Sequence, residues 1–280
     1  KETGTKPPPE SRRRLSSTTS STLFLKDKAS TLQGVLRALQ TQKGVMSIGL
    51  YATIGGVFLS YITVVPLWLV TDTAEGGYGL SITESGIVMS CSGPVLFLTQ
   101  PFLAPLLVRW LGFRRSWTLE AVLMGLGLGL TPCLDLLTAD PSSAFLGLCL
   151  IQVYINVIYQ MVLGTCFIFM NNSVSTAIRG TFLGVAHAVA STSRLVLPSL
   201  ASSLFAWTKG AVRPWPFDHH LSFYLLGVIM VALGLVSLLL PPSIDDKYAE
   251  PEATDAEDAA HGRAEGPPAG PGTADPAGKV

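Results

Sequence analysis

The stretch GVMSIGLYATIGGVFLSYITVVPLWLVT, residues 44–71, carries no charged side chain from end to end. A helix needs about 20 apolar residues to cross a hydrocarbon core of about 30 Å, because each residue adds about 1.5 Å. In that core every backbone hydrogen bond must be made within the protein, and a single helix meets this condition by itself. Residues 44–71 therefore predict a membrane-spanning helix.

Five further apolar runs follow, and the loops between them are short. They cover residues 85–108, 116–137, 142–170, 181–207 and 221–240. Among all six runs only the fifth contains a Lys or Arg, which is Arg194. The expected fold class is all-α: a polytopic membrane protein whose transmembrane domain, residues 44–242, has six helices.

The two ends of the chain are hydrophilic. Residues 1–43 are expected to form a cytoplasmic linker, and residues 243–280, rich in Ala, Pro, Gly and acidic residues, a disordered acidic tail. Leu32, Val35, Leu36 and Leu39 recur at helical spacing, with polar side chains opposite. Residues 31–43 therefore predict a short interfacial helix, or alternatively a cytoplasmic extension of the first span.

Charge in the loops predicts the orientation of the bundle. Basic residues cluster before the first run, after the second (Arg109, Arg114 and Arg115) and after the fourth (Arg179), whereas the first and third loops have none. Because cytoplasmic loops carry an excess of Lys and Arg, both termini are expected in the cytoplasm, with the fifth loop as an exception. A plasma membrane and a vacuolar membrane both fit this pattern.

Three groups of motifs resemble the zinc-induced-facilitator-like branch of the major facilitator superfamily. They are residues 67–70 (LWLV) with 76–81 (GGYGLS), residues 109–115 (RWLGFRR), and residues 171–174 (NNSV) with Arg179-Gly180, Gly184, Pro198 and residues 204–207 (LFAW). The resemblance covers about residues 44–242. It implies helices seven to twelve of that fold, the amino-terminal six-helix half being absent from this chain.

The resemblance also implies a function. In the major facilitator fold two six-helix halves enclose a solute site near the membrane midplane and rock against each other. The chain is therefore expected to act as half of an antiporter-like secondary transporter, with the lipid bilayer, the other half and a small solute as its partners. Where the family tends to carry an acidic residue in helix seven, this chain has Tyr61-Ile62-Thr63.

Arg194 is the candidate solute ligand. It lies about 14 residues, or about 20 Å, into its run, and a cation at such depth must face a cavity or a partner. His187, Ser191 and Arg194 are spaced four and three apart and so share one face of a helix. The interpretation is a cavity-lining face that binds an organic anion, a metal chelate or a drug-like molecule. The alternative is a structural Arg194 that pairs with backbone carbonyls or with a carboxylate of the other half.

The fourth run offers a matching polar stripe. Its members recur at helical spacing and are Gln152, Asn156, Tyr159 and Gln160. They are predicted to line the same cavity, although interhelical hydrogen bonding would explain the stripe equally well. Tyr51, Tyr61 and Gln100 are weaker candidates.

A cytoplasmic gate is predicted from the basic loops. Its residues are Arg109, Arg114, Arg115, Glu120, Arg179 and Gly180. Glu120 lies within reach of the arginines and near the cytoplasmic end of its run. It is therefore expected to form an ion pair with Arg114, Arg115 or Arg179 that latches neighbouring helices.

No enzyme is predicted, because phosphate loops, nucleophile elbows and metalloprotease motifs are missing from the sequence. Nucleic acid, cofactors and a metal site are not expected either. Asp218-His219-His220 has metal-ligand residue types but no further ligand at fixed spacing, so it is interpreted as a solvated loop. The competing functional hypothesis is a truncated, non-transporting membrane scaffold or regulator.

Overall fold

The structure is a computed structural model that describes residues 29–137, 140–209, 214–215 and 217–245. These fall within one compact unit of the chain, residues 1–248. Every regular element in them is a helix, which confirms the all-α class. Most of the predicted linker (residues 1–28) and acidic tail (residues 246–280) lies outside the described residues.

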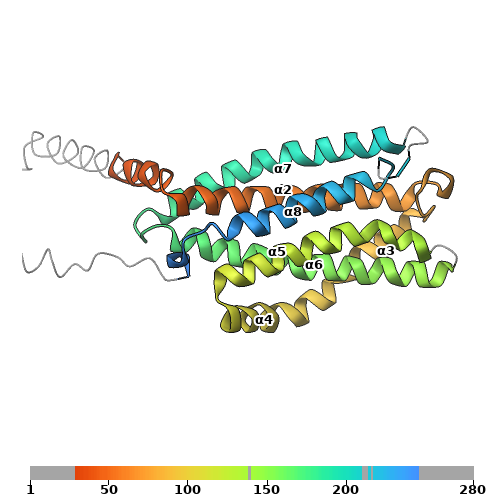
Figure 1. Cartoon of the computed structure of the whole chain (residues 1–280), viewed down its shortest axis with the longest axis horizontal. Coiled ribbons are helices and arrows are strands. Elements are labelled where there is room, and N and C mark those ends of the chain that lie inside the picture. Colours follow the sequence, from red (N-terminus) through yellow and green to blue (C-terminus); the bar gives the residue numbers. More distant parts are fainter. Residues whose placement is uncertain (1–28, 138–139, 210–213, 216, 246–280) are drawn as a thin grey trace, which may run out of the picture. The chain divides into compact units, whose positions relative to one another are not determined.

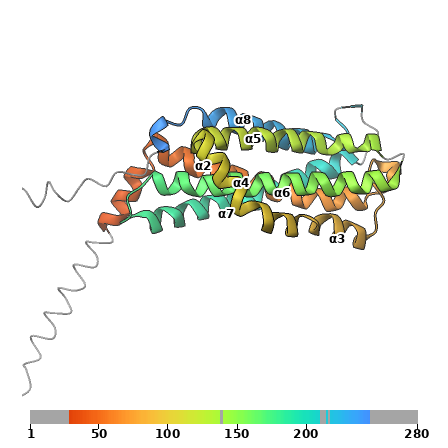
Figure 2. The ribbon, with the colours of Figure 1, turned by 90° about the horizontal axis from the view of Figure 1, so that it is seen from below.

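Seven α-helices have defined bounds within these ranges. They are α2 (Gln42–Val70), α3 (Ile82–Ser90), α4 (Ser92–Leu111), α5 (Phe113–Leu130), α6 (Pro141–Asn172), α7 (Arg179–Lys209) and α8 (Leu221–Ser237). Short 3-10 turns, η1 (Thr73–Glu75), η2 (Thr131–Leu137) and η3 (Pro242–Ile244), follow α2, α5 and α8. The long helices run side by side, as the two views in Figures 1 and 2 agree.

Four helical segments among the described residues are long and apolar enough to cross a membrane: Gln42–Val70, Ile82–Leu111, Phe113–Asp135 and Pro141–Asn172. They correspond to the first four predicted spans. The helix α7 has 31 residues but contains Arg194 and many Ser and Thr side chains, and α8 has 17 residues, or about 25 Å at the helical rise. The six-span count therefore stays a prediction, and the finding is four helical segments of suitable length and composition among the described residues.

Proline explains where two predicted runs are interrupted. The second run is divided at Cys91 into α3 and α4, three residues before Pro94. The third changes from α-helix to 3-10 turn at Thr131, directly before Pro132. A proline lacks the N–H for the helical ladder, and its ring clashes with the carbonyl four residues earlier, so both breaks are expected from the local sequence.

The predicted interfacial segment is helical over residues 29–38 and then turns. Thr41 caps the next helix, α2, by accepting a hydrogen bond from Gly44 N. The segment is therefore a separate helix and not an extension of α2. Val35 is buried and Gly34 packs against Ile178, which lies between α6 and α7, so one face of this helix contacts the bundle.

Small residues set the closest helix contacts. α2 packs along α7, α5 along α8, and α6 contacts α2, α4 and α5; in Figure 1, α7 and α2 lie along one side of the bundle. A Cβ added at Gly56 would lie 2.5 Å from Leu197 Cδ1 of α7, and one at Gly125 would lie 2.7 Å from Gly227 O of α8. Glycine thus permits both pairs of helices to approach closely, as in other membrane bundles.

Apolar side chains occupy both the interior and the exterior of the bundle. Trp68, Trp117 and Phe169 are fully buried, whereas Phe97, Phe102 and Leu195 are 83%, 75% and 72% exposed. A water-soluble bundle would carry polar groups on such an outer surface. The exposed apolar surface fits contact with lipid or with further transmembrane helices.

Candidate solute-binding site

A hydrogen-bonded chain of three side chains joins α2 and α7. Arg194 Nη2 donates to the Tyr51 hydroxyl at 3.2 Å, and that hydroxyl lies 2.9 Å from His187 Nδ1. The Arg194 guanidinium also lies 5.4 Å from the centre of the Tyr51 ring, within the range of a cation–π contact. Two of the predicted cavity residues, Arg194 and His187, are thus brought together by Tyr51.

The local sequence of α2 makes room for this arrangement. Gly55 lies one turn after Tyr51, and a Cβ there would lie 2.8 Å from Arg194 Nε. The guanidinium therefore rests against bare backbone. On the other side, the Tyr51 ring packs against Phe167 of α6 at 5.3 Å and edge-on to His187 at 5.4 Å between ring centres. The tyrosine is held on three sides, which fixes the position of its hydroxyl.

The charge of Arg194 is not balanced within the part of the chain that the structure describes. No carboxylate there lies within ion-pair distance of it, and its one hydrogen bond goes to a neutral tyrosine. Arg194 stands midway along α7 and is only half-buried, and His187 and Ser191 are exposed. Because a cation at membrane depth needs water or an anion, this face of α7 needs a polar partner.

The predicted stripe on α6 is more closely tied to packing. Gln152 is buried and accepts a hydrogen bond from Tyr61 at 2.9 Å, and Asn156 donates to the Gln152 carbonyl of its own helix. The Tyr159 ring stacks on Phe58, with 3.5 Å between ring centres. Gln160 is half-buried. On α7, the Ser191 hydroxyl donates a hydrogen bond to the carbonyl of His187 in its own helix. The stripe links α6 to α2, and its role in a cavity stays a prediction.

The predicted gate residues lie at the end of the bundle where α4 and α7 meet the loops. Arg114 Nη1 donates to the carbonyl of Leu240 at 3.1 Å, and Arg114 N donates to Asp245 Oδ1 at 2.8 Å. These bonds tie the start of α5 to the chain after α8. Arg109, Arg115 and Gly180 are exposed, and Arg179 begins α7.

The predicted ion pair of Glu120 is wrong for this structure. The Glu120 side chain is fully buried between α5 and α6, where Oε2 accepts a hydrogen bond from Thr165 Oγ1 at 3.3 Å. Its other oxygen, Oε1, has no hydrogen-bond partner among the described residues. Glu120 lies seven residues after the start of α5, or about 10 Å inward, and its side chain faces the core and not the arginine-bearing loop.

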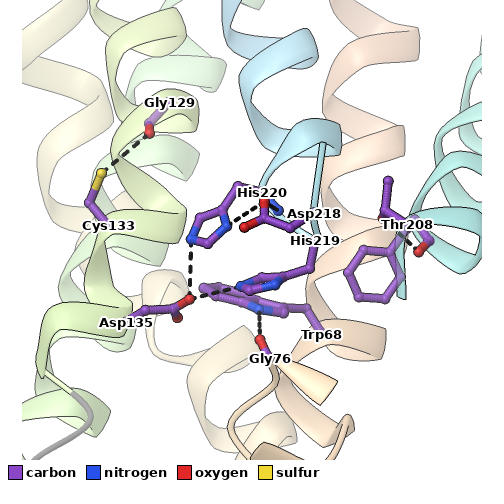
Figure 3. Close-up of polar contacts among 10 residues, drawn as sticks. Trp68, Gly76, Gly129, Cys133, Asp135, Thr208, Asp218, His219 and His220 are labelled. Atoms are coloured by element: carbon purple, nitrogen blue, oxygen red, sulfur yellow. Dashed lines mark hydrogen bonds and ion pairs between the residues drawn. The ribbon is translucent and has the colours of Figure 1, made fainter. Parts of the chain in front are cut away.

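The interpretation of Asp218-His219-His220 as a solvated loop is also wrong. The His219 and His220 side chains are only 15% and 16% exposed. Both contact Asp135, which follows α5 and was not a candidate in the sequence. Figure 3 shows the two imidazoles facing this carboxylate from the start of α8. In the sequence, the one feature that marked Asp135 was its position as an acidic residue at the end of the third apolar run. Its contact with His219 and His220 of the fifth loop was not predictable from sequence spacing.

Comparison with known proteins gives one informative likeness. The chain is 27% identical over 190 residues to Protein ZINC INDUCED FACILITATOR 1 of Arabidopsis thaliana, and the match covers 61% of this chain. The chain spans about a third of the length of that relative, 35%. No family model and no solved structure matches. The likeness supports, at most, a membrane protein of the major facilitator type.

Proposed function

We propose that this chain is the carboxy-terminal half of a major-facilitator secondary transporter, with α2, α3–α4, α5, α6, α7 and α8 as its six spans. It would move a small solute by alternating access, rocking against an amino-terminal half. The likeness to the Arabidopsis facilitator and four apolar helices of membrane-spanning length support this proposal. Both termini would then be cytoplasmic, by the charge of the loops.

The observation that carries the proposal is the charge of Arg194, which has no carboxylate within ion-pair distance among the residues that the structure describes. A guanidinium held at mid-helix by Tyr51, beside His187, presents a fork of N–H donors that matches a carboxylate or phosphate. We infer that the solute carries an anionic group, as an organic acid or a metal chelate does. A buried carboxylate of the amino-terminal half is the structural alternative.

Arg109, Arg114, Arg115, Arg179 and Gly180 would form the cytoplasmic gate. The bonds of Arg114 to Leu240 and Asp245 support this role, because they couple α5 to the segment after α8. Movement of one helix would then be transmitted to the other. Glu120 takes no part in such a latch in this structure.

Uptake by the full-length protein in proteoliposomes tests the proposal. Radiolabelled organic anions would be compared with organic cations of similar size, and each variant would be checked by fluorescence-detected size exclusion. Arg194→Lys keeps the charge but loses the planar fork, so anion uptake should fall at least tenfold while the protein stays monodisperse. Ser199→Ala, an exposed hydroxyl on the same helix, serves as the control and should transport normally.

Two outcomes would count against the proposal. Normal uptake by Arg194→Ala would show that the guanidinium does not bind the solute. A collapse of expression and monodispersity in Arg194→Ala, at a cost of about 3–5 kcal/mol, would instead indicate a structural partner charge in the other half. A non-transporting scaffold predicts no uptake above that of empty liposomes for any variant.

A further inference from the structure

We propose that Asp135, His219 and His220 bind one divalent transition-metal cation of the zinc class, at the end of the bundle where α2 and α5 end and α8 begins. With Asp218 these residues are called the Asp135 cluster. Asp135 Oδ2 lies 2.9 Å from His219 Nε2 and 3.3 Å from His220 Nε2. This site is remote in sequence and in position from Arg194, and the inference does not rest on the proposed function.

The ligand atoms already have the spacing that a metal requires. One ligand atom from each of the three residues lies within 4.8 Å of the others. In a tetrahedral zinc site, with bonds of about 2.0–2.1 Å, neighbouring ligand atoms are about 3.3 Å apart. The two observed separations from Asp135 Oδ2, 2.9 Å and 3.3 Å, are therefore within a few tenths of an ångström of those needed.

The position of His220 between two carboxylates points to a cation. Its Nδ1 lies 2.7 Å from Asp218 Oδ1, while its Nε2 faces Asp135 Oδ2. A neutral imidazole has one N–H donor, so whichever nitrogen carries the hydrogen, the other turns a lone pair toward a carboxylate oxygen. A metal ion between Nε2 and Asp135 removes this repulsion, as does a proton on the ring or on the facing carboxylate.

Asp218 acts as an orienting group for His220. Besides its contact with Nδ1, its Oδ1 accepts a hydrogen bond from His220 N at 3.1 Å, which fixes the carboxylate relative to the ring. Metal-ligating histidines usually donate their second ring nitrogen to a carboxylate in this way, which sets the tautomer and increases ligand basicity. The Asp135 cluster has this carboxylate–histidine arrangement before any metal enters (Figure 3).

The surroundings of the cluster hold His219 in place. A Cβ at Gly76 would overlap the His219 ring, and Gly76 has a φ of +82°, which favours glycine. The carbonyl of Gly76 in turn accepts a hydrogen bond from Trp68 Nε1 at 2.9 Å, so the turn beneath the ring is tied to the end of α2. The ring therefore rests on a fixed surface.

The local electrostatics also favour a cation. The Asp135 carboxylate faces both imidazoles and the Asp218 carboxylate lies beside His220, so two negative groups stand next to the position that a cation would take. Three protein ligands leave a fourth position open for water or for a donor atom of another molecule.

Metal titration of the full-length protein tests the site. The protein would carry a non-histidine affinity tag, be stripped of metal, and be titrated with ZnCl₂ by calorimetry. We expect one Zn²⁺ per chain at the Asp135 cluster, and a loss of affinity of at least tenfold in His219→Gln, in His220→Gln and in Asp135→Asn. Asp218→Asn leaves all three ligands and should lower affinity about 10–100-fold.

The control is Glu75→Gln. Glu75 pairs with Lys209 at 2.7 Å, and its substitution removes one negative charge from the loop after α2 without removing a ligand. Zinc affinity should stay within about twofold of wild type. An equal loss in this variant would indicate diffuse electrostatic attraction and would overturn the site, as would unchanged affinity in both histidine variants.

The visible absorption spectrum of bound Co²⁺ adds a measurement that needs no variant. Cobalt in the wild-type protein should give the intense bands of a four-coordinate site with nitrogen ligands. A weak spectrum of the hexa-aqua type, or the absence of binding to the wild-type protein, would show that a proton alone satisfies His220. Either result would refute the proposal even if the histidine variants failed to fold.

Discussion

Arg194 is the only charged residue of α7 between Arg179 at its start and Lys209 at its end. It is held by the Tyr51 hydroxyl and the Tyr51 ring, and both contacts are to a neutral partner. The cost of a cation at membrane depth, about 2.5–3.5 kcal/mol on insertion scales, is not offset by a carboxylate in the described part of the chain. Water, or an anion from outside these helices, would offset this cost.

Glu120 is the second ionisable residue whose role is decided by its surroundings. Its side chain is fully buried with one hydrogen bond, from Thr165. We predict that Glu120→Gln leaves the free energy of unfolding within about 1 kcal/mol of wild type or increases it, because no ion pair is broken and a costly buried carboxylate is removed. Thermal unfolding of the full-length protein in detergent measures this.

A double-mutant cycle with Arg114→Gln provides the control. Without an ion pair, the changes that the two substitutions cause in the free energy of unfolding should add to within about 0.5 kcal/mol. A loss of about 3–5 kcal/mol in Glu120→Gln, with strong coupling to Arg114, would instead restore the latch predicted from the sequence.

At the scale of elements, the contact between α2 and α7 depends on glycine. We predict that Gly56→Ala destabilises the bundle by about 1–3 kcal/mol, because the new methyl group would overlap Ser193 Oγ and lie 2.5 Å from Leu197 Cδ1. Gly49→Ala on the same helix meets nothing within 4 Å and should be neutral or slightly stabilising. Equal melting temperatures for the two variants would contradict this packing.

The helices were largely predictable from the sequence, and the contacts between them were not. The start of α6 follows from Asp140, which caps it, and from Pro141 at its first position; the ends of α3 and α5 follow from nearby prolines. These are local effects. By contrast, Asp135 meets His219 across 84 residues, so no spacing rule relates them.

The candidate solute site was likewise predictable within one helix but not between helices. The spacing of His187 and Arg194 predicted that they share a helix face, and the structure brings both to Tyr51. Tyr51 was only a weaker candidate in the sequence, because its contact with both residues depends on the register between α2 and α7. The ion pair predicted for Glu120 was wrong because closeness in sequence to Arg115 does not determine the direction in which the Glu120 side chain points.

At the scale of the whole molecule, the orientation in the membrane is open to test. Asn171-Asn172-Ser173 is a glycosylation sequon, but it lies at the end of α6 near the basic loops, and Ser173 is buried. We predict that Asn171 stays unglycosylated. In a secretory-pathway host, Gly79→Asn creates a sequon with Leu80 and Ser81 at the opposite end of the bundle and serves as the control. A glycan on Asn171, seen as an endoglycosidase-sensitive shift, would reverse the proposed orientation.

In the proposed transporter, the Arg194 face of α7 borders a water-filled solute cavity. Accessibility of an introduced thiol tests this claim most directly. Ser191 and Val189 are both exposed on α7 in this structure, and the helical period places them on opposite edges of it. The measurement compares Ser191→Cys with Val189→Cys in a full-length parent whose exposed Cys133 is replaced by alanine.

A membrane-impermeant thiol reagent reacts only where water reaches the sulfur. We expect that Ser191→Cys is modified in intact membranes, that an anionic solute protects it, and that Val189→Cys, on the proposed lipid-facing edge, reacts at least tenfold more slowly. An unreactive Ser191→Cys, or equal reaction at both positions, would show that no such cavity borders this face of α7.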